Sequence, residues 1–174
     1  MFDWLANPNR FNRITEKIQP CILFITITTL ISGLYFGLFD SPKDYQQGDA
    51  VRIMYVHVPS AWLASFLYFS LAISCVFYLV WKHPLADLVS SSIAPIGTLF
   101  SALTLVTGSL WGKPMWGTWW VWDARLTSML LLFFLYLAYI FLWQSITNKD
   151  LASKISACLL YTSDAADEGF GVDL

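Results

Sequence analysis

The sequence predicts an all-α membrane protein, a polytopic bundle of helices that crosses the bilayer several times. Hydrophobic residues make up 57% of the 174 residues, aromatic residues 17% and charged residues only 13%, which is far from the average soluble domain. Four apolar stretches reach or approach the roughly 20 residues that a helix needs to cross a bilayer. Because a water-soluble chain of this size would have to expose much of that apolar surface, we expect lipid to surround it.

The four apolar stretches are the expected spans. They run from Cys21 to Phe39, from Val58 to Trp81, from Leu88 to Leu110 and from Leu126 to Ile146. The first is too long, and too poorly followed by a small-residue cleavage site, to be a removable signal peptide, so we expect a permanent span. The four stretches contain no charged residue. Since transport pathways usually carry such groups, the sequence gives little support to a channel.

The distribution of basic residues favours a cytoplasmic N-terminus. Six lie on the side of the N-terminus, namely Arg10, Arg13, Lys17, Lys82, Lys149 and Lys154. Four lie on the other side, namely Lys43, Arg52, Lys113 and Arg125. By the positive-inside rule, the loops Asp40 to His57 and Trp111 to Arg125 are expected to face outward.

Charge and cysteine content exclude several classes of function. The net charge is -2 and no run of Lys or Arg occurs, so the chain has no nucleic-acid footprint. The three cysteines are isolated and form no CxxC pair, which argues against a thiol relay and a structural zinc site. We expect the cysteines, including Cys21 and Cys75 in apolar runs, to be buried small apolar residues.

The last segment, Cys158 to Leu174, abandons the apolar pattern. It reads CLLYTSDAADE and then GFGVDL, and one reading frame of a common transposase-type sequencing adapter encodes its first part. We interpret residues 158–174 as non-native and residues 1–157 as the integral membrane domain, with a natural chain that continues past Ala157. A genuine polar C-terminus is the alternative.

Tryptophan concentrates in one segment from Trp111 to Ser128, WGKPMWGTWWVWDARLTS, here called the tryptophan segment. Five of the nine tryptophans fall within twelve residues: Trp111, Trp116, Trp119, Trp120 and Trp122. An aromatic belt at the membrane surface is one explanation, although a belt needs only one or two such residues per span end. If Trp116 to Asp123 is helical, Trp116, Trp119, Trp120 and Asp123 share one face. That face would be an aromatic platform for a large, planar, mostly apolar ligand with a charged edge, a shape that haem has.

Polar residues near the platform have competing roles. Asp123 precedes an apolar run and is expected to be the N-cap of the fourth span. Arg125 and Arg52 are expected either to pair with acidic side chains or to bind haem propionates. Lys113 is a weaker candidate, because a lysine in a flexible loop is usually just solvated.

The chain has two histidines, His57 and His83. His57 lies in YVHVPSAW, shortly before Pro59, which is expected to open or kink the second span. It is on the same side as the tryptophan segment, whereas His83 is on the opposite side. A lone interfacial histidine is more often a plain hydrogen-bonding residue, but the platform makes His57 a candidate axial ligand for haem iron.

The tryptophan segment resembles the WWD signature of haem-handling membrane proteins in cytochrome c biogenesis. The strings DYQQGDAVRIMYVHVPSAW, APIGT and LVTGSLWGKPMWGTWW are similar to the cytochrome c maturation protein C family, also called haem exporter protein C. The resemblance covers the chain from near Trp4 to Ala157. It implies a protein of about six spans in the bacterial inner membrane that holds non-covalent b-type haem through the WWD loop and two outward histidines. His57 matches the first histidine, and the second would follow a fifth span that this chain lacks.

The family resemblance also implies a biological setting. Haem would be handed to the periplasmic haem chaperone CcmE, with the small membrane partner CcmD and the ABC-type subunits CcmA and CcmB alongside, and the chain would not be an enzyme. Two alternatives stay open, a WWD-type cytochrome c haem lyase component and a membrane scaffold without haem. The predicted haem-binding residues are Trp111, Trp116, Trp119, Trp120, Trp122, Asp123, Arg125 and Arg52, with His57 on the iron.

Overall fold

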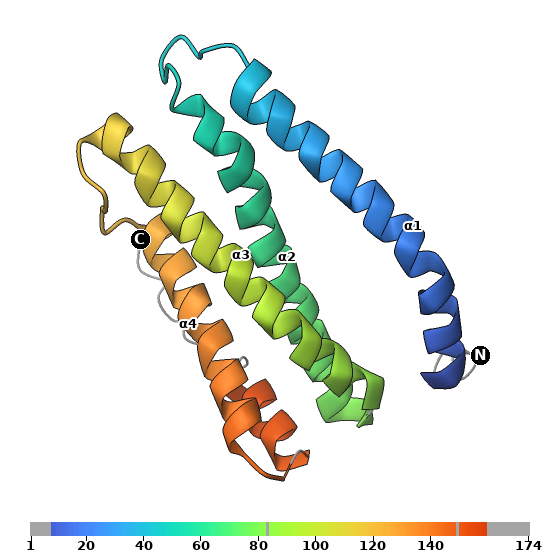
Figure 1. Cartoon of the computed structure of the whole chain (residues 1–174). Coiled ribbons are helices and arrows are strands. Elements are labelled where there is room, and N and C mark those ends of the chain that lie inside the picture. The colour runs from blue at the N-terminus through green and yellow to red at the C-terminus, as the bar shows by residue number, and fades with distance from the viewer. Residues whose placement is uncertain (1–7, 83, 149, 160–174) are drawn as a thin grey trace. The chain divides into compact units, whose positions relative to one another are not determined.

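The computed structural model describes residues 8–82, 84–148 and 150–159. Four long helices account for most of them: α1 (Pro8–Tyr35), α2 (Val51–Trp81), α3 (Pro84–Trp116) and α4 (Ala124–Ser145) (Figure 1). A π-helical turn, η1 (Phe36–Asp40), continues α1, and residues 150–159 are also helical. The described residues contain no β-strand. The predicted all-α fold class is therefore confirmed.

Each of the four long helices is apolar and long enough to cross a membrane. These candidate spans are Asn12–Asp40, Val51–Trp81, Leu85–Trp116 and Ala124–Ser145 in the described part of the chain. The predicted number of spans is confirmed, and the chain is a multi-pass membrane protein. The first three helices extend further than the apolar stretches that predicted them. Hydropathy locates only the part of a helix inside the hydrocarbon, whereas the backbone hydrogen bonds continue into the interface.

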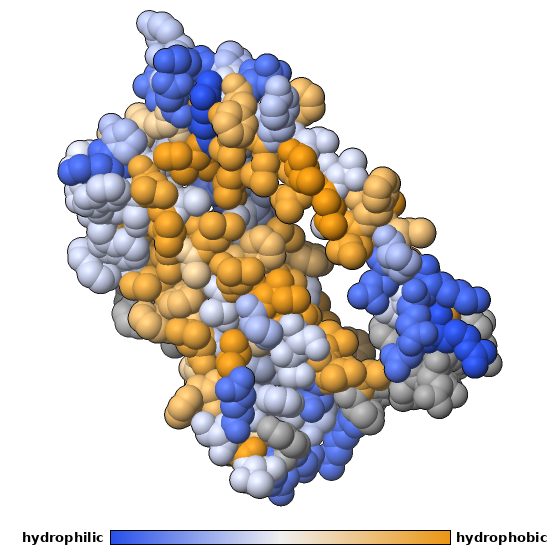
Figure 2. Space-filling view, in the orientation of Figure 1, coloured by the Kyte–Doolittle hydropathy of each residue, from blue (hydrophilic) through white to orange (hydrophobic). Residues whose placement is uncertain are grey.

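Large hydrophobic side chains cover the flanks of the helices. Phe24 and Phe141 expose 72% and 70% of their surface. Figure 2 shows hydrophobic residues along the helices on the face drawn, with hydrophilic residues gathered toward the helix ends. Such a surface would be unfavourable in water. It matches a chain whose helices satisfy their own backbone groups and face lipid.

The chain divides into two compact units, Met1–Tyr55 and Val56–Leu174. The described part of the first unit holds α1, η1 and the start of α2. Cys21 is exposed there, so the expectation that it is buried was wrong, because a single long helix offers no surface to cover it. In the second unit, Cys75 is buried as predicted, whereas Cys158 is exposed, contrary to the prediction.

The second unit has its core between α2, α3 and α4. Buried residues of the cluster include Leu71, Ala94, Tyr136 and Tyr139. Tyr136 packs directly onto Gly97, since an added Cβ at Gly97 would collide with the tyrosine ring. The Tyr136 hydroxyl donates a hydrogen bond to the Ala64 carbonyl at 2.9 Å, which ties α4 to α2.

The helix of residues 150–159 lies at the end of the bundle where α2 gives way to α3. Tyr78 donates a hydrogen bond to Asp150 at 2.7 Å, and Ser153 donates one to Asp87 at 2.5 Å. This end is opposite to the tryptophan segment, as the chain order of the helices requires. His83 and residues 160–174, most of the segment interpreted as non-native, lie outside the described residues.

Candidate functional site

The tryptophan segment is divided between a helix end and a loop. Helix α3 ends at Trp116, and residues 117–123 are not helical. Gly117 has a φ of 76° and its N–H donates to the Lys113 carbonyl at 3.0 Å, which is a glycine C-cap. The helical face expected from Trp116 to Asp123 therefore does not form. The left-handed glycine turns the chain before a second helical turn can follow.

The tryptophans pair edge to face instead of forming a flat surface. The Trp111 and Trp116 ring centroids are 5.1 Å apart with the planes at 86°, and Trp120 and Trp122 are 5.5 Å apart at 74°. Gly112 permits the first pair, because a Cβ there would lie 3.2 Å from the Trp116 ring. Trp122 exposes 77% of its surface. The loop consequently presents separate ring faces.

Two cations lie over rings of the tryptophan segment. The Arg125 guanidinium carbon is 5.6 Å from the Trp116 centroid, and the Lys113 ammonium is 5.8 Å from the Trp119 centroid. Lys113 also donates to the Gly117 carbonyl at 2.9 Å. Lys113 thus lies in the last turn of α3 and satisfies a carbonyl at the helix end, so its expected place in a flexible loop was wrong. The tryptophan segment therefore contains two cation–π contacts, one made by Arg125 and one by Lys113.

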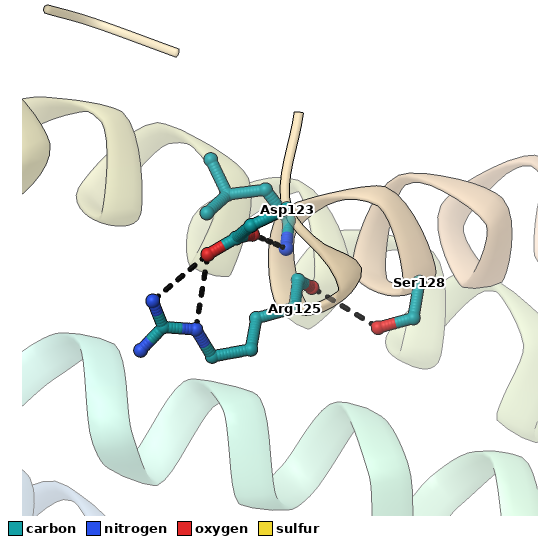
Figure 3. A network of polar contacts seen from close by, with 4 residues as sticks. Asp123, Arg125 and Ser128 are labelled. Carbon is teal, nitrogen blue, oxygen red and sulfur yellow. Dashed lines mark hydrogen bonds and ion pairs between the residues drawn. The ribbon is translucent and has the colours of Figure 1, made fainter. Parts of the chain in front are cut away.

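Asp123 is the N-cap of α4, as predicted (Figure 3). One carboxylate oxygen accepts the Leu126 N–H at 2.9 Å. The other accepts from Arg125 Nε at 3.1 Å and Nη2 at 2.8 Å. The Leu126 N–H and the Arg125 side chain hold the pKa of Asp123 below its usual value. Of the two roles predicted for Arg125, the structure shows the pairing with an acidic side chain.

His57 lies on α2 against α3. Its Nδ1 is 3.0 Å from the Thr107 hydroxyl oxygen. A Cβ on Gly108 would lie 3.1 Å from His57 Cε1, so the missing side chain makes room for the ring. Thr107 and Trp111 are four residues apart on α3 and share a face. His57 therefore contacts the same face of α3 that carries the first tryptophan. Pro59 lies inside α2, which begins at Val51, so the proline does not open the span.

Arg52 lies in the first turn of α2 and belongs to the first unit. Its Nη2 donates to the Ser41 carbonyl at 3.2 Å and lies 3.9 Å from Asp49. Lys43 forms a closer ion pair with Asp49, at 2.8 Å, and lowers the pKa of that carboxyl. Arg52 Nε is buried without a hydrogen bond among the described residues. Of the two roles predicted for Arg52, the structure likewise shows the pairing with an acidic side chain, that of Asp49.

Sequence reasoning missed Thr107 and Gly108 at the site, and it expected Gly112 to bend a loop, whereas Gly112 lies inside α3. Glycines four residues apart mark a helix face that another group approaches closely. The string TGSLWG carries that spacing. Its partner was not apparent, because His57 is fifty residues away along the chain.

The site offers three kinds of group to a ligand. His57 supplies an imidazole with one nitrogen already engaged, the tryptophans supply ring faces, and Arg125 supplies an exposed positive charge. The Trp120 indole N–H is buried and makes no hydrogen bond within the described residues. This set fits a planar apolar molecule with anionic groups and a metal that accepts an axial nitrogen.

The family model and the curated relatives that match this chain carry the same family name. The family model described as "Heme exporter protein C" matches residues 1–162. Curated proteins of that name are similar over most of the chain: 48% identity over 155 residues in Bradyrhizobium diazoefficiens, and 47% over 166 residues in Haemophilus influenzae. The protein of Escherichia coli is 44% identical over 156 residues.

The matched regions cover most of this chain but a smaller share of each relative. They include 89%, 94% and 90% of this chain, and 59%, 68% and 64% of the length of the respective relatives. The chain thus spans about three fifths to two thirds of the length of these curated relatives.

Proposed function

This chain belongs to the heme exporter protein C family, and we propose that it binds haem at the outer face of the bacterial inner membrane. In this proposal it hands the haem to the periplasmic chaperone CcmE during c-type cytochrome biogenesis. The observation that carries the proposal is the contact of His57 with the α3 face that leads into the tryptophan segment. His57, the proposed iron ligand, contacts Thr107, which lies one turn of α3 before Trp111, the first residue of the tryptophan segment.

Each group has a distinct task in binding. The haem brings the iron, and it is held non-covalently as b-type haem. His57 supplies an axial nitrogen. Trp111, Trp116, Trp119, Trp120 and Trp122 supply ring faces and edges against which the porphyrin packs. Arg125 is 77% exposed despite its pairing with Asp123, so it is available to a propionate, which competes with that carboxylate. Arg52, which pairs with Asp49, is likewise proposed to bind a propionate.

The chain positions haem and makes or breaks no bond. A second axial histidine comes from an outer loop after the fifth span of the natural protein, which has about six spans. CcmD, CcmA and CcmB are the membrane and ABC-type partners. The N-terminus is cytoplasmic and the tryptophan segment periplasmic, because six of the ten basic residues lie in segments on the side of the N-terminus and four in the loops on the other side.

The test is the absorption spectrum of the detergent-purified full-length protein and its His57→Ala variant. A Soret band that shifts or falls in the variant supports the proposal. His83→Ala, which changes the second histidine of the sequence, is the matched control and leaves the band unchanged. Absence of haem from the wild type would indicate a scaffold, and covalent attachment of haem to an apocytochrome by the purified protein would indicate a lyase.

A further inference from the structure

We propose that Thr107 is a positioning residue that holds His57 in the tautomer with its proton on Nδ1. The other ring nitrogen, Nε2, then presents a lone pair to an incoming metal. The tautomer is a property of the chain alone, whereas its use in iron ligation rests on the proposed function.

The direction of the hydrogen bond follows from the partners of the Thr107 hydroxyl. Its oxygen lies 2.7 Å from the Leu103 carbonyl and 3.3 Å from the Thr104 carbonyl. A carbonyl only accepts, and a hydroxyl has a single proton. Since that proton is directed to the nearer carbonyl, the 3.0 Å contact between Thr107 and His57 Nδ1 has Nδ1–H as the donor. A neutral ring with its proton on Nδ1 leaves Nε2 unprotonated.

Gly108 completes the arrangement by fixing where the ring lies. A Cβ at this position would approach His57 Cε1 to 3.1 Å, which is tighter than an ordinary van der Waals contact. The bare backbone of α3 therefore lets the imidazole reach the hydroxyl on the preceding residue. The ring is held on one side by a polar anchor and a close backbone surface.

The hydrogen bond from His57 to Thr107 is of the same kind as the hydrogen bonds that orient metal-binding histidines from outside the metal's own ligand set. Such histidines almost always donate their other ring N–H to an oxygen, which fixes the tautomer and raises the basicity of the binding nitrogen. Here the oxygen is a hydroxyl that is itself tied to its own helix. The orientation thus exists before a ligand arrives, which reduces the ordering cost of binding.

The first experiment measures the tautomer without haem. In haem-free full-length protein labelled with 15N-histidine, the His57 resonances are identified by their loss in His57→Ala. We expect the Nδ1–H form in the wild type and in Thr107→Ser, and a shift toward Nε2–H in Thr107→Val. An Nε2–H ring in the wild type, or a Thr107→Val spectrum identical to that of the wild type, would overturn the inference.

The second experiment measures haem titration by absorbance and the reduction potential of the bound haem. Thr107→Val is expected to lower haem affinity by roughly tenfold or more and to shift the potential, while Thr107→Ser restores both. Thr98→Val is the matched control, because the Thr98 hydroxyl also bonds to its own helix, at 2.9 Å to Ala94.

The outcomes separate this inference from the proposed function. A wild type that binds no haem contradicts the proposed function, while the tautomer measurement still decides the role of Thr107. A wild type that binds haem through His57, with unchanged affinity and potential in Thr107→Val, contradicts the role of Thr107 alone. If Thr107→Val does not fold, Gly108→Ala replaces it and is expected to push the ring from the hydroxyl and weaken the Nδ1–H form.

Discussion

Asp123 holds Arg125 through one carboxylate oxygen while its other oxygen caps α4. The arginine is bound at 3.1 and 2.8 Å, and the helix N–H of Leu126 at 2.9 Å. The N-cap hydrogen bond and the ion pair with Arg125 use different oxygen atoms of the Asp123 side chain. Substitutions can therefore remove one interaction and keep most of the other.

Asp123→Asn is expected to keep the cap and lose the charge attraction to Arg125. Asparagine is as good an N-cap as aspartate, so the melting temperature in detergent should change little, and haem content should fall little. Asp123→Ala removes both interactions and should lower the melting temperature measurably. Loss of haem in Asp123→Asn at normal stability would mean that the carboxylate itself belongs to the haem site.

Acidification is expected to weaken the Asp123 cap. Its pKa is lowered in the folded protein, chiefly by the Leu126 N–H and Arg125, so the charged form stabilises the fold. This contribution is fully present above the unfolded pKa of about 3.9 and is lost as pH falls through the folded value. Melting curves of wild type and Asp123→Asn should differ by a constant amount at pH 5 to 7, and the difference should change only below about pH 4.

Replacing tryptophans is expected to weaken haem retention in steps. If Trp116, Trp119 and Trp120 contact the porphyrin, each change to Ala removes about 1 kcal/mol of aromatic contact in addition to buried area, or roughly fivefold in affinity. Haem titration at equal protein level measures it. Trp81→Ala is the control, since Trp81 is 64% exposed at the opposite end of the bundle. Equal losses in the control and the site variants would contradict the assignment.

Local interactions of the site were predictable, and long-range ones were not. The Asp123 cap depends on a residue three positions away, so its place before an apolar run was sufficient. The end of α3 at Trp116 was also encoded locally, by Gly117, but the three- and four-residue spacing of the tryptophans suggested a longer helix. The His57–Thr107 contact joins two helices, and hydropathy says only that both cross the membrane. The beginnings of the first three helices and the end of the third were missed, because these helices continue beyond the apolar core.

Gly97→Ala is expected to destabilise the second unit strongly. The added methyl would collide with the ring of Tyr136, which is fully buried, and overpacking of this kind typically costs roughly 1–3 kcal/mol. Thermal or SDS-induced unfolding in detergent measures the loss. Gly33→Ala, on the exposed helix α1 with nothing within 4 Å of the added group, should be neutral or slightly stabilising. Similar effects of both changes would show that Tyr136 packs elsewhere in the membrane.

Reporter fusions test the proposed orientation. Fusions after Gly48 and Gly117 should report the periplasm, and one after Lys82 the cytoplasm, because of the positive-inside distribution. Both glycines lie in connections outside the helices. Reversed reporter activities would place the tryptophan segment in the cytoplasm and rule out delivery of haem to a periplasmic chaperone.

The buried hydroxyls of α3 bear on how the chain is assembled. Ser90, Ser101, Thr104 and Thr107 each bond to a carbonyl one turn back in their own helix. None of these hydroxyls needs a neighbouring helix to satisfy its proton when it enters hydrocarbon. Helix α3 can therefore leave the translocon as an independent segment and find α2 and α4 afterwards, so insertion and packing are separable steps during biogenesis.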